Sequence, residues 1–311
     1  MKQIPIGRMN KLQRDDVLNE VKILAEMDSP YIVAYYDSFI ENENLCIIME
    51  YCENGDLAQL LSQRHGKHLD EATVWKYFIE ICFALKYLHS KKILHRDIKT
   101  MNVFLSKGFH VRLGDLGVAK VLNSTANFAH TMVGTPYYLS PELCQGKPYN
   151  EKSDVWALGC VLYELCAFKH PFEARNQAAL IMKIIQEKYL PLPSMYSREI
   201  SEIITSCLQK DYRKRPTIND LLALPSIQKR MKDMELAPDN KPSERPPKAP
   251  IIQKNNEIKK PVRKPLVNKR RGNQANNNLK HVVNPSQRCR TPNDANKFRV
   301  KKSPRDPVTF I

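Results

Sequence analysis

The feature of this sequence that most constrains its fold is a series of three short polar motifs set in otherwise apolar, periodic sequence. Residues 95–102 read His-Arg-Asp-Ile-Lys-Thr-Met-Asn, residues 115–117 read Asp-Leu-Gly, and residues 140–142 read Ser-Pro-Glu. Each motif alone arises by chance and then indicates only a charged turn. The three in this order, with the internal spacing of the first one kept, are rare in unrelated folds.

In order, these motifs resemble the catalytic loop, the metal-binding D-F-G segment and the A-P-E segment of protein kinases, with Leu116 replacing the usual phenylalanine. Further stretches are similar to the NIMA-related (NEK) kinases in particular: residues 134–142 (Gly-Thr-Pro-Tyr-Tyr-Leu-Ser-Pro-Glu), 161–165, 169–172 and 19–22. The resemblance covers about residues 1–228. It implies a two-lobed eukaryotic protein kinase fold of the α+β class, with a β-rich small lobe and a helical large lobe.

The apolar patterns agree with such a division of the chain. Residues 1–52 are interpreted as part of the small lobe, from its third strand to the hinge, with strand-like runs at 31–39 and 45–50. Residues 53–230 are interpreted as the helical large lobe. Residues 231–311 form a basic tail rich in Pro, Asn and Lys, with too few apolar side chains to build a core, so we expect disorder there.

Periodic apolar residues predict individual helices. Val17, Val21 and Leu24 lie on one face of a helix that Asp15 and Asp16 are suited to begin. A long helix is expected near residues 75–88 and an apolar, buried one near 155–165. Shorter helices are expected at 180–185, 200–208 and 218–224, the last of these closing the domain.

The resemblance assigns the chemistry to the first two motifs. Asp97 would accept the proton of a substrate hydroxyl, and Lys99 would place a positive charge on the transferred phosphate. Asn102 and Asp115 would supply hard oxygen ligands to Mg²⁺. The spacing of Asp97 and Lys99 is similar to that of Ser/Thr kinases. The implied activity is transfer of the γ-phosphate of ATP to Ser or Thr of protein substrates, with ATP and Mg²⁺ as cofactors.

The same resemblance assigns a nucleotide site. Lys2 aligns with the lysine that grips the α/β-phosphates, and Glu20 with the helix glutamate that pairs with it. Met49 aligns with the gatekeeper, and the backbone at Glu50 and Cys52 would hydrogen-bond adenine. The sequence contains no G-x-G-x-x-G loop. We therefore expect a small lobe truncated before that loop, and weak activity of the chain as numbered.

Three more residues resemble structural positions of the kinase fold. Asp154 aligns with the aspartate that braces the catalytic loop from a buried helix. Glu142 of the third motif aligns with a glutamate whose partner is the arginine at position 215, Arg215. These roles are structural rather than chemical.

The segment between the second and third motifs offers a regulatory site. Thr131 stands where the resemblance places an activating phosphorylation site, and Arg96, next to the base, would receive its phosphate. Thr135 would help to hold the catalytic loop and the substrate site.

Residues 239–311 contain 19 of the 49 Lys and Arg residues but 5 of the 33 acidic ones, a net charge of +14 out of +16. This tail is suited to an acidic partner such as tubulin through nonspecific electrostatic contact. Its basic residues are not interleaved with aromatic ones, which argues against a nucleic-acid partner. The cluster Lys269-Arg270-Arg271 is a candidate nuclear-import patch.

The eight cysteines include no Cys-x-x-Cys pair, and no apolar run reaches the ~18–20 residues that span a bilayer. We expect a soluble protein with reduced thiols and no membrane partner.

The resemblance implies roles in cell division, microtubule organisation or cilia. The expected location is cytoplasmic, with the cytoskeleton (centrosome, spindle or cilium) and the nucleus as further sites.

Two alternatives to an active kinase stay open at this point. The missing glycine loop favours a pseudokinase or truncated scaffold that acts through protein interactions, whereas intact Asp97, Lys99, Asn102 and Asp115 favour the enzyme. A nucleic-acid-binding protein rests on the tail alone and is the least favoured interpretation.

Overall fold

A computed structural model describes residues 1–115 and 136–238, all of which belong to one compact unit that spans Met1–Lys254. The predicted roles of Thr131 and Thr135, and the tail from residue 239 on, lie outside the described residues. The small lobe contains β1 (Lys2–Pro5), α1 (Lys11–Glu26), β2 (Tyr35–Glu41) and β3 (Asn44–Met49).

The strands of the small lobe form an antiparallel sheet in the order β1-β3-β2, so β3 is central among the described strands. Residues 42 and 43 connect β2 to β3, with φ of 48° at Asn42 and 61° at Glu43. Two positive φ values are typical of the tight hairpin turn whose twist matches that of the strands. β1 pairs with β3 such that Lys2 lies opposite Ile47. This pairing fixes the position of Lys2.

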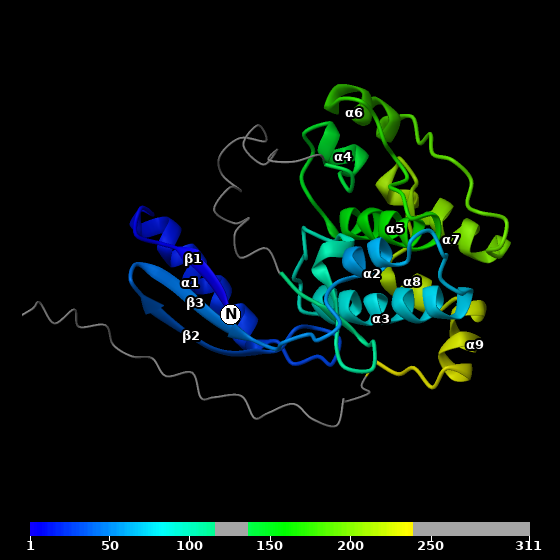
Figure 1. The fold of residues 1–311 in the computed structure, drawn as a ribbon. Helices are drawn as coiled ribbons and strands as arrows, with labels where there is room; N and C mark the ends of the chain where they lie inside the picture. Colours follow the sequence, from blue (N-terminus) through cyan, green and yellow to red (C-terminus); the bar gives the residue numbers. More distant parts are fainter. Residues whose placement is uncertain (116–135, 239–311) are drawn as a thin grey trace, which may run out of the picture. The chain divides into compact units, whose positions relative to one another are not determined.

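Helix α1 covers one face of this sheet (Figure 1). Its core-facing residues Val17, Val21 and Leu24 are buried against the strands, as the periodicity predicted. The helix begins earlier than predicted, because Asn10 caps it: the Asn10 side chain accepts from Gln13 N at 2.9 Å, and the Gln13 side chain accepts from Asn10 N at 3.0 Å. This reciprocal capping box provides a stronger start signal than the acidic pair in the middle of the helix.

Among the described residues of the large lobe, helices predominate and one short hairpin is present (Figure 1). Its elements are α2 (Leu57–Gln63), α3 (Glu71–Ser90), β4 (Val103–Leu105), β5 (Val111–Leu113), α4 (Pro141–Cys144), α5 (Glu151–Ala167), α6 (Gln177–Ile185), α7 (Arg198–Cys207), α8 (Ile218–Leu222) and α9 (Pro225–Asp233). Single 3₁₀ turns occur at Thr100–Asn102 and Tyr212–Lys214. None of the helices in the described ranges is both long and apolar enough to cross a membrane.

Helices α3 and α5 pack against each other in the core of this lobe. Both are apolar around most of their circumference, which is the pattern of a helix buried on all sides. Gly159 of α5 permits a close approach of α7, because a Cβ atom at Gly159 would lie 2.7 Å from the Cβ atom of Cys207. Helices α3, α5 and α7 are thus closely packed and support the loops at their ends.

The end of the domain differs from the sequence-based prediction. The last helix was expected at 218–224 and the tail from residue 231, but α9 continues to Asp233. Beyond it Leu236 is buried, and the Tyr31 hydroxyl donates to Ala237 O at 2.7 Å. Helix α9 is strongly polar, and Ile227 is its fully buried residue. Its sequence therefore resembles that of a polar, unstructured tail.

Hairpin β4–β5 connects the two lobes near the motif residues. Leu113 of β5 receives a backbone hydrogen bond from Val33 at 3.0 Å and donates one to Tyr31 at 2.7 Å. Residues 31–33 lie between α1 and β2 of the small lobe. The hairpin therefore carries the second motif, which follows β5 directly, to the edge of the small lobe.

Candidate active site

Lys99 and Asn102 of the first motif both lie within hydrogen-bonding distance of the Asp97 carboxylate. The carboxylate of Asp97 accepts hydrogen bonds at 3.0 Å from Lys99 Nζ and at 3.0 Å from Asn102 Nδ2. Asn102 Nδ2 also donates to the Asp97 carbonyl at 2.7 Å, so the amide clamps the loop on itself. The Asp97 side chain keeps 19% of its surface exposed. A single carboxylate is thus held in place and is still accessible to a substrate.

Asp154, on helix α5, holds the backbone of this loop by hydrogen bonds. Its carboxylate accepts from His95 N and Arg96 N at 3.1 Å each, from the Tyr149 hydroxyl at 2.5 Å, and bonds His89 Nε2 at 2.8 Å. Burial alone would raise the pKa of Asp154, but these hydrogen bonds and nearby histidines hold it below its usual value. Arg96 adopts a φ of 67°, which the two backbone bonds maintain.

His95 joins the first motif to the second. Asp97 N donates to His95 Nδ1 at 3.2 Å, so the ring proton lies on Nε2, which donates to Gly114 O at 3.0 Å. Burial lowers the pKa of His95, which favours this neutral form. Gly114 N in turn donates to Asn102 O at 2.9 Å. Position 114 has room only for glycine, because a Cβ atom there would lie 2.7 Å from the Phe104 ring.

Lys2 of β1 and Asp115 form a direct ion pair. The sequence predicted Glu20 as the partner of Lys2, and that pairing stays a prediction, while the structure shows a contact of Lys2 with Asp115. Glu20 lies on α1, and its side chain is not among those described. Both members of the pair are partly exposed, at 29% and 39% of their side-chain surface. Lys2, which was assigned to phosphate, and Asp115, which was assigned to the metal, are therefore in direct contact.

A cavity of about 320 Å³ opens beside this ion pair. Lys2 and Asp115 line one part of it, and the hinge residues Met49, Glu50 and Cys52 line another. Apolar side chains complete the walls, among them Ile32, Ile47, Phe104 and Leu113. The cavity thus combines an apolar interior with charged groups at its edge, as small-molecule sites commonly do.

Glu50 fastens the hinge to the rest of the protein through both its side chain and its backbone. Its carboxylate accepts from Ala34 N at 3.0 Å and from Arg112 Nε at 2.8 Å, and Glu50 N donates to Ala34 O at 2.8 Å. Arg112 lies on β5 and is 3% exposed. Arg112 was not among the residues predicted from the sequence, although an arginine between two buried apolar residues of a short strand signals a buried acidic partner.

Glu142 and Arg215 form the expected pair. Arg215 Nη1 and Nη2 donate to the two carboxylate oxygens at 2.9 and 2.7 Å, and Ser153 Oγ donates to Glu142 at 2.6 Å. Burial alone would raise the pKa of Glu142, but the Arg215 and Ser153 hydrogen bonds and the Arg215 charge hold it below its usual value. Both side chains are almost fully buried, at 0% and 2% exposure.

A second network behind the catalytic loop was not predicted. Thr100 Oγ1 donates to Glu164 at 3.2 Å, and the Tyr138 hydroxyl donates to the same carboxylate. The ring of Tyr137 stacks on His170 at 4.0 Å between centroids, with 13° between the ring planes. Residues 137 and 138 lie shortly after residues 116–135 in the chain. The network therefore connects residues 137 and 138 to the loop that carries Asp97.

The donor set fits ATP and Mg²⁺. Asn102 and Asp115 offer an amide and a carboxylate, and Mg²⁺ in phosphate-transfer sites is commonly held by one or two such groups and substrate phosphates. Within residues 1–115 and 136–238 no cluster of three or more His, Cys, Asp or Glu side chains suits a metal ion. Lys2 is suited to phosphate, and the apolar walls to a flat base.

Comparison with known proteins agrees with this geometry. The family model described as "protein kinase domain" matches residues 1–227. The chain is 48% identical to "Serine/threonine-protein kinase Nek1" of Mus musculus over 231 residues, which are 74% of this chain and 19% of that protein. It is 46% identical to "Serine/threonine-protein kinase Nek5" of Homo sapiens over 229 residues, 73% of this chain and 32% of that protein.

A third relative is a protein of Dictyostelium discoideum. The chain is 48% identical over 233 residues to "Probable serine/threonine-protein kinase nek3" of Dictyostelium discoideum, which is 73% of this chain and 21% of that protein. The chain therefore spans between about a fifth and a third of the length of these three relatives. The similarity lies in the part of the chain that carries the three motifs.

Proposed function

Because this chain belongs to the protein kinase family, and within it groups with the NEK serine/threonine kinases, we propose that it phosphorylates Ser or Thr side chains of protein substrates. One observation carries the proposal. Asp97 is held by Lys99 and Asn102, while His95 and Gly114 connect this loop to Asp115 beside the cavity. The proximity of these residues supports the proposal that Asp97, Asn102 and Asp115 act at one site in phosphate transfer.

The chain's own residues position the reacting groups. The Asp97 carboxylate would orient the substrate hydroxyl and accept its proton, while Lys99 would offset negative charge on the transferred group. The backbone around Asp97 is already fixed, because Asp154 accepts from His95 N and Arg96 N and Asn102 donates to the Asp97 carbonyl. When bound, ATP supplies the phosphoryl group and Mg²⁺ neutralises part of its charge.

The cavity residues would hold the nucleotide. The N–H of Glu50 already donates to Ala34 O, so an adenine contact at this residue falls to its carbonyl, with Cys52 as the second hinge contact. Lys2 would bind phosphate, and Asn102 with Asp115 would hold Mg²⁺. Ile47 and Leu113 provide apolar surface for the base.

Partners and location are also part of the proposal. The net charge of +14 in residues 239–311 supports an acidic protein partner such as tubulin, at a cytoplasmic or cytoskeletal location. Phosphorylation of Thr131, with Arg96 as its receiver, is proposed as the activating modification.

The test is the Asp97→Asn variant of the full chain. We expect phosphate transfer from ATP to a Ser-containing peptide to fall by about 10²–10⁴-fold, since the proton acceptor is lost. Mg²⁺-dependent ATP binding, measured by titration calorimetry, should persist because Asn102 and Asp115 are unchanged. Asp233→Asn, on the exposed side of α9, is the matched control. Transfer by Asp97→Asn at the wild-type rate contradicts the proposed role, and ATP binding without transfer in the wild type favours a scaffold.

A further inference from the structure

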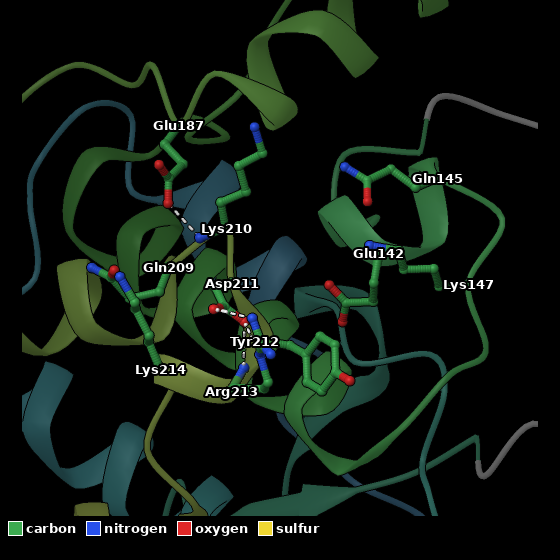
Figure 2. A pocket seen from close by; sticks show the side chains of 10 residues that line it. All are labelled: Glu142, Gln145, Lys147, Glu187, Gln209, Lys210, Asp211, Tyr212, Arg213 and Lys214. Atoms are coloured by element: carbon green, nitrogen blue, oxygen red, sulfur yellow. Dashed lines mark hydrogen bonds and ion pairs between the residues drawn. The ribbon is translucent and has the colours of Figure 1, made fainter.

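A second and larger cavity, of about 650 Å³, lies on the large lobe away from the nucleotide site (Figure 2). One wall comes from α4 and the residues after it, with Glu142, Gln145 and Lys147. The opposite wall comes from the turn that follows α7, residues 209–214, and from Glu187 after α6. None of the residues assigned to ATP, metal or the substrate hydroxyl lines this cavity.

The acidic groups of this cavity are already engaged with protein donors. Glu142 is paired through both oxygens with Arg215. Asp211 accepts from Arg213 Nε and Nη2 at 2.9 Å each, and Glu187 accepts from Lys210 N. Glu142 and Asp211 are thus each paired with an arginine, whereas Glu187 is bonded to a backbone N–H and keeps its negative charge.

The lysines of the cavity are in the opposite situation. Lys147, Lys210 and Lys214 are exposed, and their ammonium groups form no hydrogen bond or ion pair with residues in the described ranges. Figure 2 shows Lys147 and Lys210 on opposite walls. The Gln145 side-chain amide and the Tyr212 hydroxyl likewise make no hydrogen bond to a described side chain or backbone group. The lining contains four Lys or Arg and three Asp or Glu residues, so the cavity carries a net positive charge together with neutral donors.

We propose that this cavity is a binding site for an anionic peptide segment of another protein, with a phosphorylated Ser or Thr or a run of acidic side chains as the recognised group. Lysine ammonium groups bind such groups as point charges, which matches a surface site without a fixed fork of donors. The volume exceeds what one phosphate fills, so a side chain with adjoining backbone fits better than a free ion. Tyr212 is the single aromatic residue in the lining, so no pair of rings holds a nucleotide base.

The occupant comes from another molecule. Residues 239–311 carry a net charge of +14, and residues 116–135 contain one lysine and no Asp or Glu, so neither stretch supplies acidic side chains that would complement the cavity. α4 follows residues 116–135 in the chain and is connected through Glu142 and Ser153 to α5, which holds the catalytic loop through Asp154. A partner anchored here would be held on the same rigid element as the active site. The site itself does not depend on the proposed kinase activity.

The test compares binding of three fluorescein-labelled ten-residue peptides to the full chain by fluorescence anisotropy. The peptides share a Gly/Ala background with a central phosphoserine, three consecutive aspartates, or an unmodified serine. The cavity variant is Lys147→Ala/Lys210→Ala/Lys214→Ala. The control variant, Lys67→Ala/Lys229→Ala/Lys232→Ala, removes the same charge from exposed positions that do not line the cavity. Because the net charge of the two variants is equal, nonspecific attraction by residues 239–311 is the same in both.

We expect the charged peptides to bind about tenfold more weakly to the cavity variant, and the control variant to match the wild type within about twofold. The tighter of the two charged peptides identifies the source of the charge. Equal weakening in both variants overturns the proposal, and so does equal binding of the charged and unmodified peptides.

A position-specific readout keeps the test independent of affinity. A benzophenone group placed next to the phosphoserine or the aspartates should crosslink to residues 142–147 or 209–214, identified by mass spectrometry. Crosslinks confined to residues 239–311 overturn the proposal. Matching thermal unfolding midpoints of the three proteins exclude a folding defect as the cause of lost binding.

Discussion

Arg112 and Glu50, which lie 62 positions apart in the chain, meet in a 2.8 Å hydrogen bond behind the nucleotide cavity. Their side chains are 4% and 13% exposed. Because Glu50 also binds Ala34 N, this one carboxylate fastens the hinge to both β5 and the start of the small-lobe sheet. The side-chain pair therefore supports the cavity through Glu50, which lines it and whose carbonyl is proposed to contact adenine.

Replacing this arginine should therefore affect both stability and nucleotide binding. Arg112→Met leaves the Glu50 carboxylate buried without its cationic partner, and we expect a loss of about 2–4 kcal/mol in the free energy of unfolding. ATP affinity should fall as well, since the Glu50 carbonyl loses its fixed position. Denaturant unfolding and calorimetric ATP titration measure the two effects. The control is Arg213→Met, an exposed ion-pair arginine whose loss should change the free energy of unfolding little. Similar effects of the two substitutions would contradict the role of Arg112.

The Glu142–Arg215 pair gives a second stability prediction. Arg215→Met removes the partner of a carboxylate that is 2% exposed, and we expect a loss of about 3–5 kcal/mol, seen in urea unfolding. The double variant Glu142→Met/Arg215→Met should be less destabilised than the sum of the single variants, because it leaves no unpaired buried charge. Arg198→Met, which breaks an exposed pair on α7, should cost about 0.5 kcal/mol or less. Additive single effects at Glu142 and Arg215 would rule out a buried coupled pair.

The same glutamate predicts how stability depends on pH. The pKa of Glu142 is below its ordinary value of 4.5 in the folded protein, so the unfolded chain takes up a proton first on acidification. The contribution of Glu142 is therefore complete above about pH 4.5 and is lost as the pH falls through the lower folded pKa. The difference in unfolding free energy between wild type and Glu142→Gln should be constant from pH 7 to 5 and should narrow below pH 4.5. A difference that grows on acidification would show that the sign is wrong.

Gly159 predicts a packing defect. Gly159→Ala places a Cβ atom 2.7 Å from Cys207 Cβ and 3.1 Å from Leu208 Cδ2, so α5 and α7 must separate. We expect a net loss of about 1–3 kcal/mol, even though alanine favours the helical backbone by about 1 kcal/mol. The double variant Gly159→Ala/Cys207→Gly restores the room, and its two effects should be less than additive in unfolding experiments. Strict additivity would mean that the two positions do not collide.

Much of the active site could be predicted from the sequence because its residues lie in short continuous motifs. The distances between Asp97, Lys99 and Asn102 are set within one loop, so the motif alone specifies them. The contact of Lys2 with Asp115 could not be predicted in this way. It depends on how β1 and the segment after β5 approach one another, and no short motif contains both residues.

The same distinction applies to the fold. Helices α3 and α5 are evident in the sequence because each has long apolar faces that only burial explains. Helix α9 was missed because its burial rests on Ile227, and a polar helix with one anchor has the composition of a tail. The Arg112–Glu50 contact joins distant segments, and a sequence indicates that such a residue needs a partner without saying which one it is.

The placement of the two tryptophans has a practical spectroscopic consequence. Trp75 lies on α3 beneath the Arg230 guanidinium, and Trp156 lies on α5 between Arg215 and the stacked ring of Phe172. Both indoles are at most 1% exposed, and both belong to the large lobe. Intrinsic emission excited at tryptophan wavelengths will therefore follow the opening of the helical lobe and will be silent when β1, β2, β3 and α1 loosen. A fluorescence melt alone would report a single transition even if the small lobe opened first, and amide hydrogen exchange at β3 would be needed to detect that earlier step.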